Sequence, residues 1–273
     1  LKPTIDLIDL KKKINKKTKV ILPVHLYGSV ANLNGINQKF TTQDASYLNV
    51  GTSPFAVTSV VNIGTGVTVT SYSKSDINTN SLVLVHVKPT NVLSIYLGVL
   101  QSYQLIESAP LPTGIHSLTV NINRTTSLDQ VELFIDGVLY TGGFTYSGVD
   151  STGFDLLQDG FLEIGALRST PSDFFGYCSW FNGYLIGQQF TQADAVYLSN
   201  LKCWDTMVAE NPTLTNKFAE YVELGTYNGS TELQARTGKV NGWVFDNIGS
   251  APFTGTGLSV ECGGTPPDPP PVT

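Results

Sequence analysis

Apolar and polar residues alternate in short runs over most of the chain, from about residue 38 to residue 190. Glycine, proline, asparagine and serine separate these runs. A period of two is typical of strands that bury one face, and this punctuation is typical of turns. The pattern predicts strands over residues 67–72, 82–87, 92–97, 116–123, 130–135, 138–140, 161–165 and 184–190. Many short strands spaced by roughly ten residues predict an all-β fold, an antiparallel β-sandwich of the jelly-roll kind.

Two local signals predict how elements begin and turn. Asp136-Gly137 predicts a two-residue hairpin between neighbouring strands, because both turn positions need a positive φ. Thr191 is a suitable N-cap for a short helix over 191–198, and Asp194 then lies at the third helical position. We therefore expect a tight β-turn and, 54 residues after it, a capped helix.

Residues 201–262 predict a C-terminal helix and further strands that pack on the sandwich. Four apolar residues recur at helical spacing between residues 212 and 224: Leu214, Phe218, Tyr221 and Val222. They predict one helix over 212–224 that covers the sandwich edge. Glu220 and Glu223 are then expected on the solvated face of this helix. Glycine-punctuated strands are predicted over 227–253. The predicted fold thus ends with one or two short helices and these strands.

Residues 1–37 differ from the rest and predict an N-terminal arm or docking segment. A lysine-rich stretch leads into the nearly continuous apolar run Lys19-Val-Ile-Leu-Pro-Val-His-Leu-Tyr-Gly28. This run resembles a strand of the DegT/DnrJ/EryC1/StrS sugar aminotransferases, which implies pyridoxal phosphate chemistry. The Schiff-base lysine and the pyridinium-holding aspartate that such an enzyme needs have no counterpart downstream. A remnant aminotransferase fragment is therefore the least favoured function, and His25 is interpreted as a packed core residue.

The same pattern divides the chain into four predicted parts. An arm over 1–37 precedes the sandwich over 38–200, and the helix-and-strand part over 201–262 follows it. Residues 263–273 are rich in proline and predict an extended exit linker, which is typical of one module in a larger assembly. Whether the arm packs on its own sandwich or on a neighbouring copy stays open.

A second resemblance covers about residues 38–200 and concerns the laminin G-like, concanavalin A-like lectin jelly roll. Four segments carry it in the order that the family has: 40–50 as an opening strand, 116–122 with 131–139 as a hairpin, 162–165, and 181–186. The chain departs from the family at Ile115, where a tryptophan is usual. The resemblance implies a two-sheet module for adhesion or ligand binding, whose relatives often hold calcium.

Charge limits the class of partner. Only 14% of residues are charged, and the formal net charge is −6. Residues 1–39 hold 8 basic and 2 acidic residues, which leaves 40–273 with 8 basic and 20 acidic residues, a formal −12. Such a body repels phosphate backbones, so nucleic acid is not expected as a partner. The lysines between residues 11 and 19 are interpreted as the solvated face of a short helix rather than a nucleic-acid patch. No apolar run is long enough for a membrane span.

The motifs of common enzymes are missing from the sequence. Glycan hydrolysis needs two carboxylates in one cleft, and neither Glu132 with Asp136 nor Asp155 with Asp159 has a suitable arrangement. There is no G-x-S-x-G elbow, and His86 and His116 lie in strands, where packing explains them. We therefore expect no enzyme and no cofactor.

Metal chemistry and cysteine pairing are weakly specified. The three cysteines lack zinc-site spacing, and the sequence does not decide whether any two pair: Cys178, Cys203 and Cys262. Calcium binding stays open, with Asp150, Asp155 and Asp173 as candidate loop ligands that follow no EF-hand spacing.

A dense aromatic run over 174–181 is the strongest candidate for ligand binding. Aromatic faces stack on sugars while nearby polar groups orient hydroxyls. The candidate ligand-binding residues are Asp173, Phe174, Tyr177 and Trp180. Alternatively, every second member of the run fills the core, namely Phe175, Tyr177 and Phe181.

These observations predict a non-enzymatic structural or adhesion module of a surface or virion assembly, such as a phage fibre or a capsid decoration. The expected partners are other copies or subunits, and glycan is a further candidate. The expected location is extracellular, at a cell surface or on a virion. The alternative is a jelly-roll polysaccharide depolymerase.

Overall fold

The computed structural model describes the parts of the chain that form the sandwich and its helical layer. The described residues are 38–41, 46–64, 68–76, 81–99, 102–124, 130–156, 162–164, 178–200, 203–223, 232–233 and 243–247. The predictions for the arm over 1–37 and for the linker over 263–273 lie outside them.

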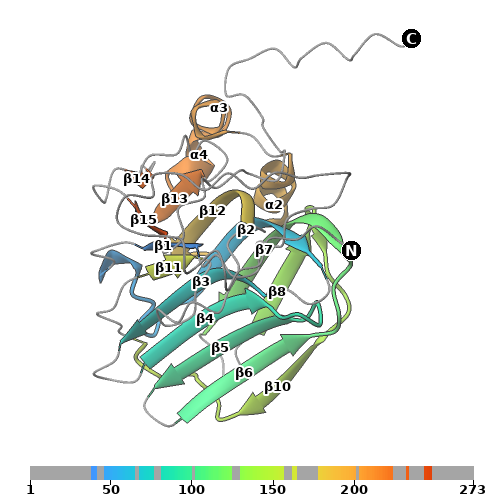
Figure 1. Ribbon diagram of the computed structural model, residues 1–273, viewed down its shortest axis with the longest axis vertical. Helices are drawn as coiled ribbons and strands as arrows, with labels where there is room; N and C mark the ends of the chain where they lie inside the picture. The colour runs from blue at the N-terminus through green and yellow to red at the C-terminus, as the bar shows by residue number, and fades with distance from the viewer. Residues whose placement is uncertain are drawn as a thin grey trace, which may run out of the picture.

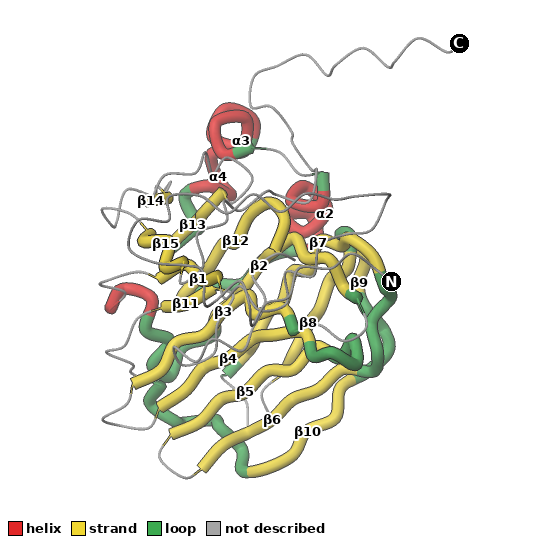
Figure 2. The backbone as a smooth tube through the Cα atoms, in the orientation of Figure 1, coloured by secondary structure: helices red, strands yellow, loops and turns green. Residues whose placement is uncertain are grey.

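Two antiparallel sheets face each other, as the sequence predicted (Figures 1 and 2). The nine-stranded sheet has the order β10-β6-β5-β4-β3-β11-β1-β15-β14. Its strands are β1 (Gln38–Thr41), β3 (Val69–Asp76), β4 (Ser81–Val87), β5 (Leu93–Val99), β6 (Ser102–Ser108), β10 (Phe144–Gly148), β11 (Leu162–Ile164), β14 (Glu232–Leu233) and β15 (Trp243–Asn247). The six-stranded sheet has the order β13-β12-β2-β7-β8-β9. Its strands are β2 (Phe55–Ile63), β7 (Gly114–Asn123), β8 (Gln130–Ile135), β9 (Val138–Leu139), β12 (Cys178–Ile186) and β13 (Glu220–Glu223).

The main core lies between the two sheets and follows from the alternation. In β4, Val83, Val85 and Val87 point inward, and in β7 Leu118 and Ile122 meet them from the other sheet. Each such side chain contributes about 1.5–3 kcal/mol on full burial. The alternation therefore decides which side chains of each strand point away from the main core.

A layer of three short helices covers the outer face of the six-stranded sheet (Figure 1). These are α2 (Gln192–Ser199), α3 (Trp204–Glu210) and α4 (Pro212–Thr215). Their residues Leu198, Met207 and Leu214 form a second core with strand residues that point away from the first one, among them Phe181. The interpretation of Phe181 as a core residue is confirmed.

Local signals agree with the structure where they depend on neighbouring residues alone. β8 has the predicted bounds, and Asp136 and Gly137 have φ values of 51° and 77° in the hairpin turn. Thr191 caps α2 in a reciprocal box: its hydroxyl accepts from the Asp194 N–H, and the Asp194 carboxylate accepts from the Thr191 N–H.

The single helix predicted over 212–224 is wrong. The chain forms α4, turns, and continues as β13, in which Tyr221 points to the helical core and Val222 to the main core. The placement of Glu220 on a solvated face is wrong too, because Glu220 is fully buried. Its carboxylate accepts from the Tyr47 hydroxyl at 2.5 Å and from the Tyr221 N–H at 2.8 Å.

Other elements differ from the prediction or were missed by it. The strand predicted over 40–50 is instead the short β1 followed by a 3-10 turn, η1 (Ser46–Leu48). The sequence also did not predict β2, β6, β10 or α3. Of these, β2 and β6 are paired with a strand on each side, so pairing with those neighbouring strands sets their length.

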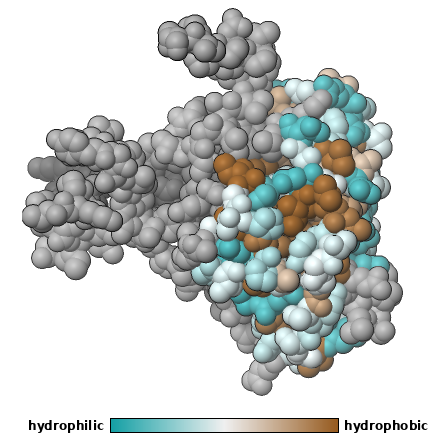
Figure 3. Space-filling view, turned by 90° about the vertical axis from the view of Figure 1, so that its right-hand side faces the viewer, coloured by the Kyte–Doolittle hydropathy of each residue, from teal (hydrophilic) through white to brown (hydrophobic). Residues whose placement is uncertain are grey.

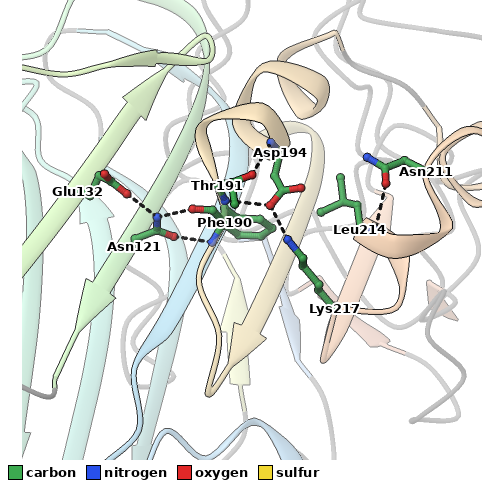
Figure 4. A network of polar contacts seen from close by, with 8 residues as sticks. All are labelled: Asn121, Glu132, Phe190, Thr191, Asp194, Asn211, Leu214 and Lys217. Carbon is green, nitrogen blue, oxygen red and sulfur yellow. Dashed lines mark hydrogen bonds and ion pairs between the residues drawn. The ribbon is translucent and has the colours of Figure 1, made fainter.

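Asn121 fastens the helical layer to the six-stranded sheet (Figure 4). It is buried on β7, and its side-chain amide pairs with the backbone of Phe190, just before α2. Its Nδ2 donates to the Phe190 carbonyl at 2.8 Å, and its Oδ1 accepts from the Phe190 N–H at 2.9 Å. Nδ2 also donates to Glu132 at 2.9 Å. The amide thus replaces a strand partner for Phe190.

We expect Asn121→Leu to lower the free energy of unfolding by about 2 kcal/mol, because it leaves both Phe190 backbone groups unpaired. Urea unfolding measures the change. The matched control is Glu132→Ala, which keeps the pairing with Phe190 and is expected to cost less than about 1 kcal/mol. Equal losses in the two variants would contradict this role of Asn121.

Candidate functional site

The outer face of β4, β5 and β6 carries a compact grid of side chains that point away from the main core. Cross-strand pairing sets three rows: His86–Ser94–Glu107, Leu84–Tyr96–Leu105 and Leu82–Gly98–Tyr103. We call these nine residues the tyrosine face. Its β4 side is buried, and on its β6 side Tyr103 is 43% exposed.

Two tyrosines stack on each other at this face. The ring centroids of Tyr96 and Tyr103 lie 4.9 Å apart, with an angle of 16° between the ring planes. Gly98 makes room for the pair, because a Cβ at that position would lie 2.6 Å from Cε1 of Tyr96. Tyr96 is half-buried, so the pair is held in place and offers a rigid aromatic surface.

Polar atoms without hydrogen-bond partners lie next to this aromatic surface. His86 Nδ1 and Ser94 Oγ, on directly paired residues, are buried and have no partner. Ser73 on the adjacent strand β3 is 1% exposed, and its Oγ lacks a partner as well. A buried polar group without a partner costs about 1–3 kcal/mol, so these three atoms lower the stability of this region of the sheet.

The charges at the face are balanced. Lys88 forms an ion pair with Glu107 at the end of the polar row. Burial, together with the nearby Lys88 charge, lowers the pKa of His86 from 6.5 to about 4, with Glu107 opposing the shift. His86 is therefore neutral at pH 7, and its imidazole offers a hydrogen-bonding nitrogen without a charge.

This arrangement suits binding of a ligand that has both an apolar face and several hydroxyl groups. The exposed Tyr103 ring is placed to contact the apolar face, and the partly exposed Lys88–Glu107 pair is placed to exchange hydrogen bonds with ligand hydroxyls. Acid–base cleavage of a glycosidic bond needs two carboxylates, and the nine residues include only Glu107. The tyrosine face has the composition of a binding surface.

The two outer faces of the sandwich are not equivalent. Helices α2, α3 and α4 bury much of the outer face of the six-stranded sheet, including Ala56 and Val60 of β2. The tyrosine face lies on the other sheet, away from these helices (Figure 1). The exposed part of the tyrosine face lies on β6, where Tyr103 is 43% exposed.

The ligand-binding residues predicted from the aromatic run are not tested by the structure. Asp173, Phe174 and Tyr177 lie outside the described residues. Trp180 belongs to β12, and its side chain is not described. Sequence reasoning did not select Tyr96 or Tyr103, although the spacing Tyr-x-Gly followed by a tyrosine five residues later was visible.

The candidate calcium ligands and the cysteines also lie partly inside and partly outside the described residues. Asp150 accepts the Thr152 N–H at 2.9 Å in a loop, and Asp155 is exposed. Within the described residues, no three His, Cys, Asp or Glu side chains are grouped as a metal site would require. The Cys203 thiol is buried and lies 3.1 Å from the Thr206 hydroxyl. Asp173 and Cys262 fall outside the described part of the chain.

Carboxylates elsewhere are engaged in structural contacts. The Asp194 carboxylate accepts from Lys217 at 2.7 Å; burial opposes ionisation, but the Lys217 and Thr191 bonds outweigh it and lower the pKa of Asp194. Asp136 accepts from the Ser117 N–H and lies 2.7 Å from His116 Nδ1 in the hairpin turn.

In the part of the chain that the structure describes, no helix has the length and apolar character that a membrane crossing needs.

The same two-sheet arrangement is found in solved structures. A proposed carbohydrate-binding protein of Bacteroides ovatus superimposes with a TM-score of 0.51 and 16% sequence identity, over 79% of this chain and 59% of the other. The fold is a lectin-like jelly roll. This confirms the predicted concanavalin A-like sandwich, and this jelly-roll chain spans 59% of the length of the Bacteroides protein.

More distant lectin-like structures match with lower scores. The SAP-like pentraxin of Limulus polyphemus gives a TM-score of 0.42 and 11% identity, over 62% of this chain and 78% of that one. The CBM40 domain of the Ruminococcus gnavus IT-sialidase gives 0.39 and 10%, over 59% and 97% respectively. Similarity at this level supports no inference about the jelly roll described here.

Sequence comparison gives one partial match. The DegT/DnrJ/EryC1/StrS aminotransferase family matches residues 2–45, which agrees with the resemblance seen in the arm and leaves residues 46–273 uncovered. A search of the curated proteins found no significant match to the chain.

Proposed function

We propose that this jelly roll is a non-enzymatic module that binds glycan on the tyrosine face. The stacked Tyr96–Tyr103 pair, whose Tyr103 ring is 43% exposed, carries the proposal. A pyranose ring offers a C–H face for the aromatic surface and hydroxyls for the partly exposed Lys88–Glu107 pair at the end of the polar row. The fold neighbour from Bacteroides ovatus, itself a proposed carbohydrate-binding protein, supports this assignment.

Charge favours a neutral glycan over an acidic one. Among the described residues, the cation beside the face is Lys88, which is paired with Glu107, and His86 is uncharged at neutral pH. Residues 40–273 carry a formal −12, which disfavours the approach of anionic ligands. A neutral oligosaccharide therefore meets the lower electrostatic barrier.

The proposed setting is a surface or virion assembly outside the cell, for example a phage fibre or a capsid decoration. Low charge content and a hydroxyl-rich sequence support it, together with the lectin-like fold. In such an assembly the module contributes adhesion, while neighbouring subunits hold it in place. A particle-binding assay in which the purified module competes for host cells tests this setting.

Removing the exposed ring is expected to abolish most of the binding. A glycan array with the full chain identifies a ligand, and titration calorimetry with the soluble oligosaccharide then compares variants. We expect Tyr103→Ala to weaken affinity by tenfold or more, because stacking of a ring on an aromatic side chain contributes about 1–3 kcal/mol in the comparable case of nucleic-acid bases. The matched control is Tyr146→Ala on β10, an equally exposed tyrosine that points to the opposite side of the same sheet.

Two results would contradict the assignment of the site. One is unchanged affinity of Tyr103→Ala. The other is loss of binding in Trp180→Ala while Tyr103→Ala binds normally, which would favour the aromatic run over 174–181 instead. Release of reducing ends from the bound polysaccharide would favour the depolymerase alternative.

A further inference from the structure

β10 is an edge strand without the usual protection against pairing. Among the strands that the structure describes, it ends the nine-stranded sheet, where it pairs with β6 on one side. Four of its five residues are exposed, and the following Val149 is 54% exposed. Natural edge strands are commonly protected by lysine, proline, inward charges or bulges. Residues 138–149 contain no charged residue and no proline.

Apolar side chains are exposed along the same side of the sandwich. In β10, Tyr146 occupies a core-facing position opposite Ile106 but is 41% exposed. In β9, the edge strand of the six-stranded sheet, Val138 faces the core side beside Ile135 and is 67% exposed. Figure 3 looks onto the side of the molecule where β9 lies, and apolar residues gather there among hydrophilic ones.

The charge pattern favours a second copy of this chain as the partner of the β10 edge. A body with a formal −12 repels another copy where its acidic residues gather, so an uncharged edge is the part of it that a second copy approaches with the least repulsion. In a two-fold interface every residue is present twice, and an uncharged strand avoids the like-charge contacts that this doubling would create. The segment 138–149, lying between Asp136 and Asp150, is such a stretch.

We propose that two copies of this chain pair through antiparallel β10 strands across a two-fold axis. The pairing satisfies the outward backbone groups of β10 and covers Tyr146 and Val149. It joins two nine-stranded sheets into one. Because the axis is perpendicular to the sheet, both tyrosine faces lie on the same side, so the dimer engages a repeating glycan at two points. This last consequence rests on the proposed function, whereas the pairing does not.

Light scattering of the full chain over a range of concentrations tests the pairing. We expect the wild type to reach a mass twice 29.4 kDa. Tyr146→Lys places two like charges in the new strand pair and is expected to return the mass to that of one chain. The matched control is Tyr103→Lys, a tyrosine of the same exposure on the neighbouring strand, and it is expected to stay dimeric. Val196→Lys, on α2, is expected to stay dimeric as well.

Thr145→Lys provides a second probe of the same strand, because its side chain is exposed on the other side of β10. Circular dichroism and melting temperature establish that each variant is folded. A wild type that stays monomeric at all concentrations overturns the proposal, and so does a dimer that both β10 variants leave intact. Loss of the dimer with intact affinity for a soluble oligosaccharide leaves glycan binding standing, so the two proposals fail separately.

Discussion

Replacing Arg124 with methionine is expected to lower the free energy of unfolding by about 4 kcal/mol, because a buried cation that joins three loops is lost. Arg124 follows β7 and is 2% exposed. Its guanidinium donates to the Gly51 carbonyl, to the Ser151 carbonyl at 2.9 Å and to the Phe154 carbonyl at 2.7 Å. Methionine fills a similar volume but leaves three carbonyls without this donor.

Urea unfolding of Arg124→Met measures the loss, and Arg124→Lys shows what charge alone retains. Lysine keeps the cation but has no planar fork that reaches three carbonyls, so we expect an intermediate loss. Lys88→Met, which removes a half-exposed ion pair with Glu107, is the matched control and should change stability by less than about 1 kcal/mol. A loss in Arg124→Met no larger than in Lys88→Met would show that the three carbonyls do not depend on Arg124.

Acidification from pH 6.5 to pH 4 is expected to destabilise the wild type by about 3 kcal/mol through His86 alone. Burial, with Lys88 nearby, lowers the pKa of His86 from 6.5 to about 4 in the folded protein. Between these values the unfolded chain binds a proton at His86 and the folded chain does not. The free energy of unfolding therefore falls as the pH falls through this window, and the effect is complete below about pH 4.

His86→Phe removes this titration while keeping an aromatic ring of similar size. We expect its stability profile between pH 6.5 and pH 4 to be flatter than that of the wild type by about 3 kcal/mol. At pH 7 the two proteins should differ little, since the imidazole is neutral and its Nδ1 has no partner. Parallel profiles for the two proteins would exclude His86 as the source of the pH dependence.

Local chemistry carried the successful part of the sequence prediction. The hairpin at Asp136 and Gly137 depends on the φ values of two residues, and the cap of α2 depends on Thr191 and Asp194, three residues apart. Such signals need no knowledge of distant partners. The alternation of apolar residues likewise predicted the two sheets, because burial on one face is a property of each strand.

Tertiary context decided the elements that the sequence did not predict. Phe218, Tyr221 and Val222 match a helical period, yet two hydrophobic cores on opposite sides of β13 select the strand alternation instead. In β6 a buried Gln104 faces inward, where its side-chain carbonyl accepts from Ser151, while Tyr103 faces outward. Because a polar residue points inward and an aromatic residue outward, the hydrophobic pattern of β6 does not indicate a strand.

The tyrosine face could be predicted only in part. Leu82 and Leu84 lie in a run that is apolar on both faces, which indicates that the outer face of β4 is covered as well. The meeting of Tyr96 with Tyr103 needs the register of β5 against β6 and the space that Gly98 leaves. Neither follows from composition or from local spacing.

A crystal structure of the full chain with a bound neutral oligosaccharide tests the glycan-binding face most directly. We predict a sugar ring in contact with the exposed Tyr103 side of the stacked pair. A sugar seated away from β4, β5 and β6, for example against Trp180, would contradict this account.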